Sequence, residues 1–283
     1  MIERVFPVLP PIVREDIPVG QRKVPREVRS WRRFQRRVRK DPAPLLATLS
    51  RYPRCVLVAG CQRSGTTMVT RIIAGSAGFR RFQFTHDDEL DAALALAGRL
   101  DLPSGLRYCF QTTYLNERYT EYGSMGPNQK LIWVLRNPYS VIYSMVYHWR
   151  RFALTELYKS SIQQTPELER ARQHRLPWPI GLATLERACI AYASKTNQLN
   201  SVKKVISADQ LMVLDYDELI RTPAEVLRHV FAFVGEAYYD HYASTIRSDT
   251  LRKADRLSSR ERVLIEDLAL PVYVQCRSLL SAL

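Results

Sequence analysis

The chain has 283 residues and a formal net charge of +14, a length that fits one α/β domain with no linker dividing it. No run of eighteen apolar residues occurs, and the N-terminus lacks both a signal-peptide core and a membrane anchor, so the sequence predicts a cytoplasmic protein. The five cysteines are scattered and show none of the paired spacings that are typical of a zinc site.

Positive charge is concentrated near the start of the chain, where ten Lys and Arg residues lie between Arg22 and Lys40. Apolar residues, Trp31 and Phe34 among them, alternate with these charges at helical spacing. Such a helix docks on the domain, lies on an anionic membrane surface or contacts a polyanion, and docking is the favoured interpretation. Peripheral membrane contact through residues 22–40 stays open, whereas nucleic acid is not expected as a partner.

The segment at residues 55–67, CVLVAGCQRSGTT, is the most informative part of the sequence. It begins with an apolar run suited to a parallel strand buried on both faces, Gly60 and Gly65 bracket a tight turn, and a helical pattern follows. Unpaired amides and the positive end of the helix dipole then converge, so the segment predicts a site for a tetrahedral anion. The alternative is an ordinary glycine turn. Cys61 lies where a helix end would lower a thiol pKa, although an inert residue is favoured.

The spacing of the two glycines matches the loop that binds nucleoside triphosphates, up to Thr66, which stands in place of lysine. A Walker-type ATPase is therefore disfavoured, because that class needs the lysine to bridge the outer phosphates. The cation is instead Arg63, before the second glycine, and Thr66 and Thr67 come after that glycine. A P-loop small-molecule kinase remains an alternative.

A second apolar strand is predicted at Leu131–Leu135, and an Arg-Asn-Pro tripeptide stands where it ends. Asn137 suits a helix cap and Pro138 suits the first helical position. Arg136 offers the planar fork of donors that binds phosphate, and Ser144 follows it eight residues later.

A third apolar strand is predicted at Leu211–Leu214, followed by an acidic stretch that contains Tyr216 and by a helix that ends at Gly235. Two further strands are predicted near residues 107 and 205.

In this order, the three segments resemble the sulfotransferases that use 3′-phosphoadenosine-5′-phosphosulfate (PAPS), over residues 52–275. The resemblance implies a P-loop-like three-layer α/β/α fold with a central parallel sheet, whose ligand lies at the carboxyl ends of the strands beside Arg63 and Arg136. Arginine in the first loop is similar to the tyrosylprotein and carbohydrate branches. The chain would then divide into a basic N-terminal extension, residues 1–50, and a sulfotransferase domain, residues 51–283.

The resemblance also implies which residues bind PAPS and its product, adenosine 3′,5′-bisphosphate (PAP). The first loop would hold the 5′-phosphosulfate, the second segment the 3′-phosphate, the tyrosine would lie near the adenine, and a late lysine would add a second cation. The full set is Arg63, Ser64, Gly65, Thr66, Thr67, Arg136, Ser144, Tyr216 and Lys253. No metal is expected, because Arg63 and oriented donors can stabilise the charge of in-line sulfuryl transfer.

The general base is marked less clearly. Aryl sulfotransferases use a Lys-Thr-His stretch, and residues 110–113, FQTT, contain neither that lysine nor that histidine. Other branches take a carboxylate some twenty residues past the loop, which makes Asp87 and Asp88 the catalytic candidates, with Glu89 and His86 behind them. The rival interpretation of these residues is an acidic helix start.

For the acceptor, the sequence favours a carbohydrate or lipid-linked alcohol over a phenolic metabolite. The aromatic-rich segments at residues 108–122 and 150–178 lie between the cofactor segments and are expected to line or cover the acceptor cleft. Outside this class, a noncatalytic basic module that binds membrane or nucleic acid remains an alternative.

Overall fold

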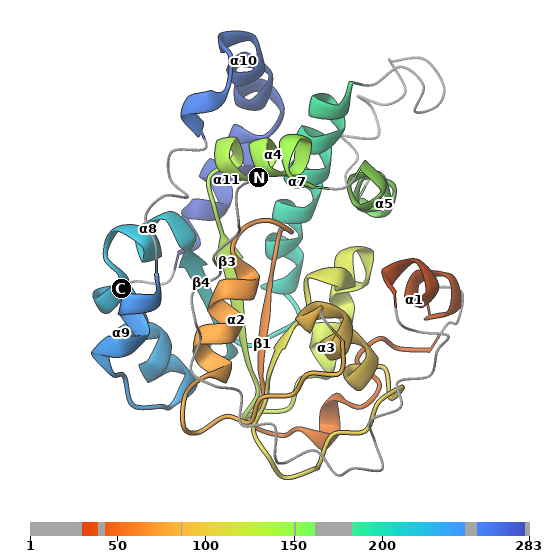
Figure 1. The fold of residues 1–283 in the computed structure, drawn as a ribbon, viewed down its shortest axis with the longest axis vertical. Coiled ribbons are helices and arrows are strands. Elements are labelled where there is room, and N and C mark those ends of the chain that lie inside the picture. Colours follow the sequence, from red (N-terminus) through yellow and green to blue (C-terminus); the bar gives the residue numbers. More distant parts are fainter. Residues whose placement is uncertain are drawn as a thin grey trace, which may run out of the picture.

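The computed structural model describes residues 30–38, 43–85, 87–149, 151–161, 183–246 and 254–280. At its centre is a parallel four-stranded sheet in the order β2-β1-β3-β4 (Figure 1). The strands are β1 (Val56–Gly60), β2 (Cys109–Gln111), β3 (Lys130–Leu135) and β4 (Leu211–Asp215). Gly60 pairs with Val134 and Leu135 with Asp215, so β1, β3 and β4 end along the same edge of the sheet.

Side chains of the strands alternate between two hydrophobic clusters, one on each face of the sheet. Leu57 and Trp133 belong to the larger cluster, whereas Val58 and Ile132 belong to the smaller one. Because both faces are covered, the strands read as continuous apolar runs in the sequence. The predicted three-layer α/β/α fold with a central parallel sheet is confirmed.

The smaller cluster is covered by α2 (Thr66–Ala74), α8 (Tyr216–Arg221) and α9 (Pro223–Val234); in Figure 1, α8 and α9 lie on the left and α2 lies beside β1. The larger one is covered by α1 (Trp31–Val38), α3 (Asp88–Leu96), α4 (Pro138–Tyr147), α5 (Arg151–Ser161), α7 (Thr184–Val202), α10 (Ser259–Leu268) and α11 (Leu270–Arg277). Short 3-10 segments lie at η4 (Leu49–Arg51), η7 (Ala208–Gln210) and η8 (Asp240–Thr245), whereas η5 (Thr113–Ser124) is a longer 3-10 region with a kink at Asn116 and Arg118.

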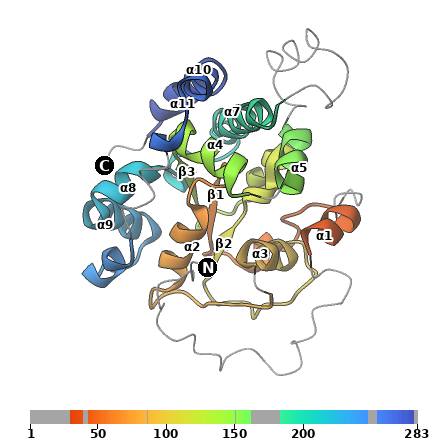
Figure 2. The same ribbon diagram turned by 45° about the horizontal axis from the view of Figure 1, so that its top comes forward.

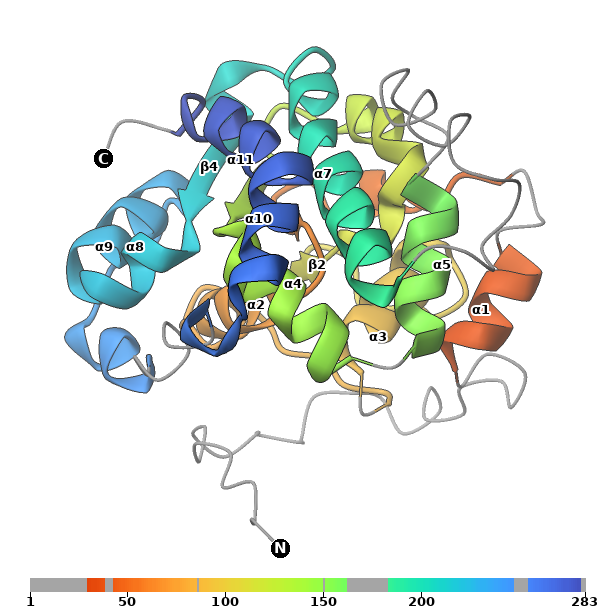
Figure 3. The same cartoon turned by 90° about the horizontal axis from the view of Figure 1, so that it is seen from above.

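The long helix α7 organises the layer on the larger cluster. It packs against α4, α5, α10 and α11, an arrangement that Figures 2 and 3 show from two directions. On the opposite layer, α9 ends at Gly235, which is left-handed with φ of 70°, as predicted from the sequence.

The prediction of a strand near residue 205 is wrong. After α7, the amides of Lys204 and Val205 donate back to the carbonyls of Ser201 and Val202, so the helical turn uses the donors that a strand would need. Strand β4 begins only at Leu211.

The described part of the N-terminal extension is packed into the larger cluster. Phe34, Leu45 and Leu49 are each 1% exposed, and Thr48 Oγ donates to the carbonyl oxygen of Ala95 at 2.8 Å. The predicted boundary at residue 50 therefore does not coincide with a gap in the core. Within the described ranges, every helix falls short of the length and apolar character required of a membrane-spanning segment.

Candidate functional site

The loop between β1 and α2 has a backbone that few residues other than glycine can adopt. Gly60 has φ of 137°, and a Cβ atom there would lie 2.4 Å from the carbonyl oxygen of Val134 on β3. Gly65 has φ of 97°, and its Cβ atom would lie 1.9 Å from Cε2 of Tyr216. Arg63 is left-handed with φ of 72°, although it is not glycine. Positive φ at a non-glycine residue is uncommon and collects at ligand-binding loops, so the loop conformation is consistent with a binding role.

A hydrogen bond joins this loop to the segment that follows β3. Arg63 Nε donates to Ser144 Oγ on α4 at 3.0 Å, across a separation of 81 residues in the sequence. Ser144 is buried, whereas Arg63 is exposed at the carboxyl end of the sheet. The two segments predicted to bind opposite ends of one nucleotide therefore meet directly.

Arg136, at the end of β3, is only 3% exposed. Its guanidinium carbon lies 4.5 Å from the centre of the Tyr216 ring, and its Nε lies 3.6 Å from Asp217 Oδ1. Since the same tyrosine ring touches Gly65, Arg136 and the first loop border one region of the molecule.

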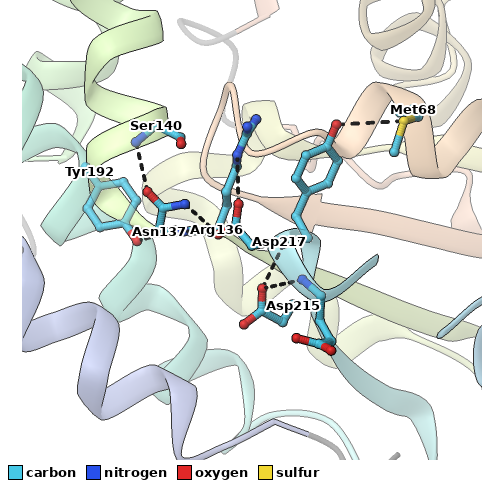
Figure 4. A network of polar contacts seen from close by, with 9 residues as sticks. Met68, Arg136, Asn137, Ser140, Tyr192, Asp215 and Asp217 are labelled. Carbon is cyan, nitrogen blue, oxygen red and sulfur yellow. Dashed lines mark hydrogen bonds and ion pairs between the residues drawn. The ribbon is translucent and has the colours of Figure 1, made fainter. Parts of the chain in front are cut away.

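The start of α4 is fixed by a polar network that Figure 4 shows in close-up. Asn137 caps the helix by accepting from the Ser140 amide at 2.9 Å, as predicted. Its own amide and its side-chain Nδ2 both donate to one oxygen of Asp217, at 2.9 and 2.6 Å. Asp217 thus links the Arg-Asn-Pro segment to α8, a role that the sequence interpretation missed; the short spacing from Tyr216 was the only signal.

A second carboxylate, Asp215, lies beside Asp217 where β4 ends. It caps α8 through the amides of Asp217 and Glu218, and it lies 3.5 Å from Arg277 Nε. Burial and the neighbouring Asp217 raise the pKa of the Asp215 carboxyl.

The two aspartates predicted as catalytic candidates both have structural partners. Asp87 caps α3 by accepting from the Leu90 amide at 3.1 Å, and its other oxygen accepts from Trp31 Nε1 at 2.7 Å. Asp88 forms an ion pair with Arg71 at 2.6 Å. The acidic helix start that was the rival interpretation is therefore present.

Glu89, ranked behind these aspartates, has the environment of a base. Its carboxylate oxygen Oε1 accepts a hydrogen bond from Thr113 Oγ1. Burial raises the pKa of Glu89 from 4.5 to about 7, and the Thr113 hydroxyl and the buried ammonium of Lys195 partly oppose this shift. A carboxyl with a pKa near neutrality can exchange a proton with substrate at physiological pH.

Comparison with known families decides which class of protein this site belongs to. A model of the sulfotransferase domain matches residues 53–260, and the region it matches contains both arginine segments and the acidic start of α3. This chain belongs to the sulfotransferase family.

Solved structures of other sulfotransferases have the same fold. The sulfotransferase domain of an olefin synthase from Synechococcus PCC 7002 is 13% identical, with a TM-score of 0.52, 82% of this chain covered and 96% of that one. The corresponding domain of the curacin biosynthetic pathway is 14% identical, with a TM-score of 0.50 and coverages of 76% and 97%. Mouse sulfotransferase SULT7A1, complexed with PAP, is 13% identical, with a TM-score of 0.50 and coverages of 84% and 94%. The sequence matches no curated protein significantly.

Some predicted features of the sulfotransferase site lie outside the described residues: His86, Lys253, and residues 150 and 162–178 of the segment expected to cover the acceptor cleft. The favoured interpretation of Cys61 as an inert residue is supported, because the side chain is buried and burial raises its pKa to about 12. Among the described residues, no group of three or more His, Cys, Asp or Glu side chains could hold a metal ion.

Proposed function

We propose that this sulfotransferase moves the sulfuryl group of PAPS to the hydroxyl of a carbohydrate or lipid-linked alcohol, with a phenolic metabolite as the second choice of acceptor. The observation that supports PAPS as donor is the hydrogen bond between Arg63 and Ser144. It joins the loop expected to hold the 5′-phosphosulfate to the helix expected to hold the 3′-phosphate, and PAPS carries both groups on one adenosine.

The residues present fit this donor. Ser64 Oγ is buried and has no hydrogen-bond partner in the described part of the chain, while Thr67 is exposed at the start of α2. Together with Arg63 and Arg136, they provide hydroxyl and guanidinium donors for two anionic groups. Thr66 is buried, and its Oγ1 accepts from Gln111 Nε2 at 3.1 Å, so its backbone amide at the helix start is its expected contribution.

PAPS supplies the sulfuryl group, whose sulfur–oxygen bond to the 5′-phosphate breaks while a bond to the acceptor oxygen forms. Arg63 would neutralise charge that develops on the departing phosphate, acting electrostatically because arginine does not readily release its proton. Arg136 and Ser144 would hold the 3′-phosphate, and Tyr216 would support the loop through its contact with Gly65.

Glu89 is the base in this proposal, ahead of Asp87 and Asp88. It would take the proton of the acceptor hydroxyl as the new sulfur–oxygen bond forms, and its pKa of about 7 suits that step near neutral pH. Both aspartates already have partners, because Asp87 caps α3 through the Leu90 amide and Asp88 pairs with Arg71.

A lipid-linked acceptor also agrees with the charge of α1. Arg32 and Arg33 are exposed on this helix while Phe34 is buried against the core, so its outward side is basic. We therefore include peripheral contact of a cytoplasmic enzyme with an anionic membrane in the proposal.

Two measurements test the proposal. Calorimetry with PAP should register binding, and Arg136→Ala should weaken it by about 2 to 4 kcal/mol, whereas Arg277→Ala, which removes an exposed partner of Asp215, should not. Sulfate transfer from labelled PAPS should then be screened against pooled glycans, lipid-linked alcohols and phenols. Absence of PAP binding by the folded protein would refute the donor, and transfer confined to phenols would refute the preferred acceptor. ATP turnover that depends on a divalent ion would favour the kinase alternative.

A further inference from the structure

The helix that precedes the matched sulfotransferase region contacts both elements that hold Glu89. The family match begins at residue 53, whereas α1 ends at Val38. Figures 1 and 2 show α1 beside α3, and the ring contact between Trp31 and Tyr114 places α1 against η5 as well. The helix is therefore next to the proposed base, although it lies outside the region that the family model matches.

The contact with α3 is a hydrogen bond at the first turn of that helix. Trp31 Nε1 donates to Asp87 Oδ2 at 2.7 Å, while Asp87 Oδ1 accepts from the Leu90 amide at 3.1 Å. Asp87 is thus held from both sides, by α1 and by the helix that it caps. Glu89 lies in that first turn, two residues after the cap, so a shift of Asp87 would move the Glu89 backbone with it.

The contact with η5 is an aromatic cluster. The rings of Trp31, Phe34 and Tyr114 lie 5.4 to 6.0 Å apart, and Phe34 and Tyr114 are almost fully buried. Tyr114 directly follows Thr113, whose hydroxyl donates to Glu89. The Tyr114 backbone also lies close enough to the Glu89 carboxyl to lower its pKa. Packing of the Trp31 indole against Tyr114 therefore fixes the part of η5 that orients the Glu89 carboxylate.

We propose that Trp31 is a positioning residue for sulfuryl transfer, which clamps α3 and η5 together so that the Glu89 carboxylate stays aligned with the acceptor hydroxyl. This inference rests on the proposed role of Glu89 as the base. Trp31 acts through Asp87 and Tyr114, and its loss reduces turnover rather than donor binding, because neither contact touches the arginine segments. A misalignment of a reacting group by about 1 Å can cost about a hundredfold in rate.

A matched control exists at the other end of α3. Thr48 Oγ donates to the carbonyl oxygens of Ala95 and Leu96, at 2.8 and 3.1 Å, and so ties the same N-terminal segment to α3 far from Glu89. Trp31→Phe removes the donor and keeps an aromatic ring, whereas Thr48→Val removes the hydroxyl and keeps the shape. A purely structural role of Trp31 predicts the same kinetic effect from both variants.

The experiment compares the two variants with the unmodified protein in sulfate transfer and in PAP calorimetry. We expect kcat of Trp31→Phe to fall at least about tenfold, with the KM for PAPS and the Kd for PAP unchanged, and kcat of Thr48→Val to stay within about twofold. Equal kcat values for both variants, or a Trp31→Phe defect that lies in PAP binding, would overturn the clamp.

A third variant keeps the test informative if Trp31→Phe does not fold. Asp87→Ser retains a good helix cap but is too short to reach the indole, and it should show the same kcat loss with intact PAP binding. Unchanged kcat in Asp87→Ser overturns the proposal. Where both single variants fold, kcat of the double variant should be no lower than kcat of Asp87→Ser alone, since both changes remove the same Trp31–Asp87 hydrogen bond.

The outcome for the proposed function is separate. If the unmodified protein neither binds PAP nor transfers sulfate, the donor assignment fails. If it transfers sulfate and Glu89→Gln remains fully active, the clamp fails, because the carboxylate that it aligns is not needed.

Discussion

Gly65 is the residue at which the first loop touches the third segment, and two separate physical reasons require glycine there. Its φ of 97° disfavours any L side chain, and an added Cβ would overlap the buried ring of Tyr216. Gly105 allows the two effects to be measured separately: it has φ of 81°, but no atom lies within 4 Å of an added Cβ, so a substitution there introduces backbone strain alone.

We predict that Gly65→Ala weakens PAP binding at least about tenfold and lowers stability more than Gly105→Ala does. The control variant should lose about 1 to 2 kcal/mol from backbone strain alone and keep its PAP affinity. Calorimetry and urea unfolding measure the two quantities. Equal effects of both substitutions on PAP binding would show that the Tyr216 contact does not shape the loop.

The proposed role of Glu89 predicts how kcat depends on pH. If it is the base, it must be ionised, so kcat should rise with pH up to about 7 and level off above that value. Glu89→Gln should remove this rise, whereas Asp88→Asn should keep it. If Asp88→Asn removes the rise instead, the base is Asp88.

The raised pKa of Glu89 also affects stability, but stability should fall with rising pH where kcat rises. The folded state disfavours the ionised form of Glu89, so this group costs stability increasingly as pH rises from about 4.5, its usual value, to about 7. Glu89→Gln should therefore be more stable relative to the unmodified protein at pH 8 than at pH 4. Denaturant unfolding at the two pH values checks this sign.

At the scale of elements, the ends of β3 and β4 are held together by the contact between Asn137 and Asp217. Asn137 caps α4 with its oxygen and donates to Asp217 with its nitrogen, so the two roles use different atoms. Aspartate is as good a cap as asparagine, but it would face the buried Asp217 with a second carboxylate.

We predict that Asn137→Asp lowers the free energy of unfolding by about 2 kcal/mol or more, at least as much as Asn137→Ala, although only the alanine variant loses the cap. PAP affinity should fall in both, because Arg136 is adjacent and contacts the same Asp217. The check is urea unfolding at pH 7. An Asn137→Asp variant as stable as the unmodified protein would mean that capping alone matters.

At the scale of the whole molecule, local signals and long-range contacts differed in how well the sequence predicted them. The glycine loop, the Asn137 cap and the Gly235 helix end were predicted because each depends on a few adjacent residues. Contacts that assemble the site join residues far apart in the sequence, 56 positions for Trp31 with Asp87 and 81 for Arg63 with Ser144. Local pattern contains no information on such pairs. The wrong strand prediction near residue 205 has a local cause instead, because the apolar pair there continues the helical turn that follows α7.

The placement of α1 bears on where the folded domain begins, and Phe34 tests it. This ring is 1% exposed and packs at 6.0 Å from the ring of Tyr114, while Arg32, two residues earlier on the same helix, is exposed. Phe34→Ala should lower the free energy of unfolding by about 3 to 5 kcal/mol, the usual cost of deleting a buried aromatic ring, and Arg32→Ala by less than about 0.5 kcal/mol. Both values come from denaturant unfolding of the full chain. If Phe34→Ala is as stable as Arg32→Ala, the N-terminal segment is an appendage and the domain begins near residue 51; a large difference extends the cooperative unit to α1.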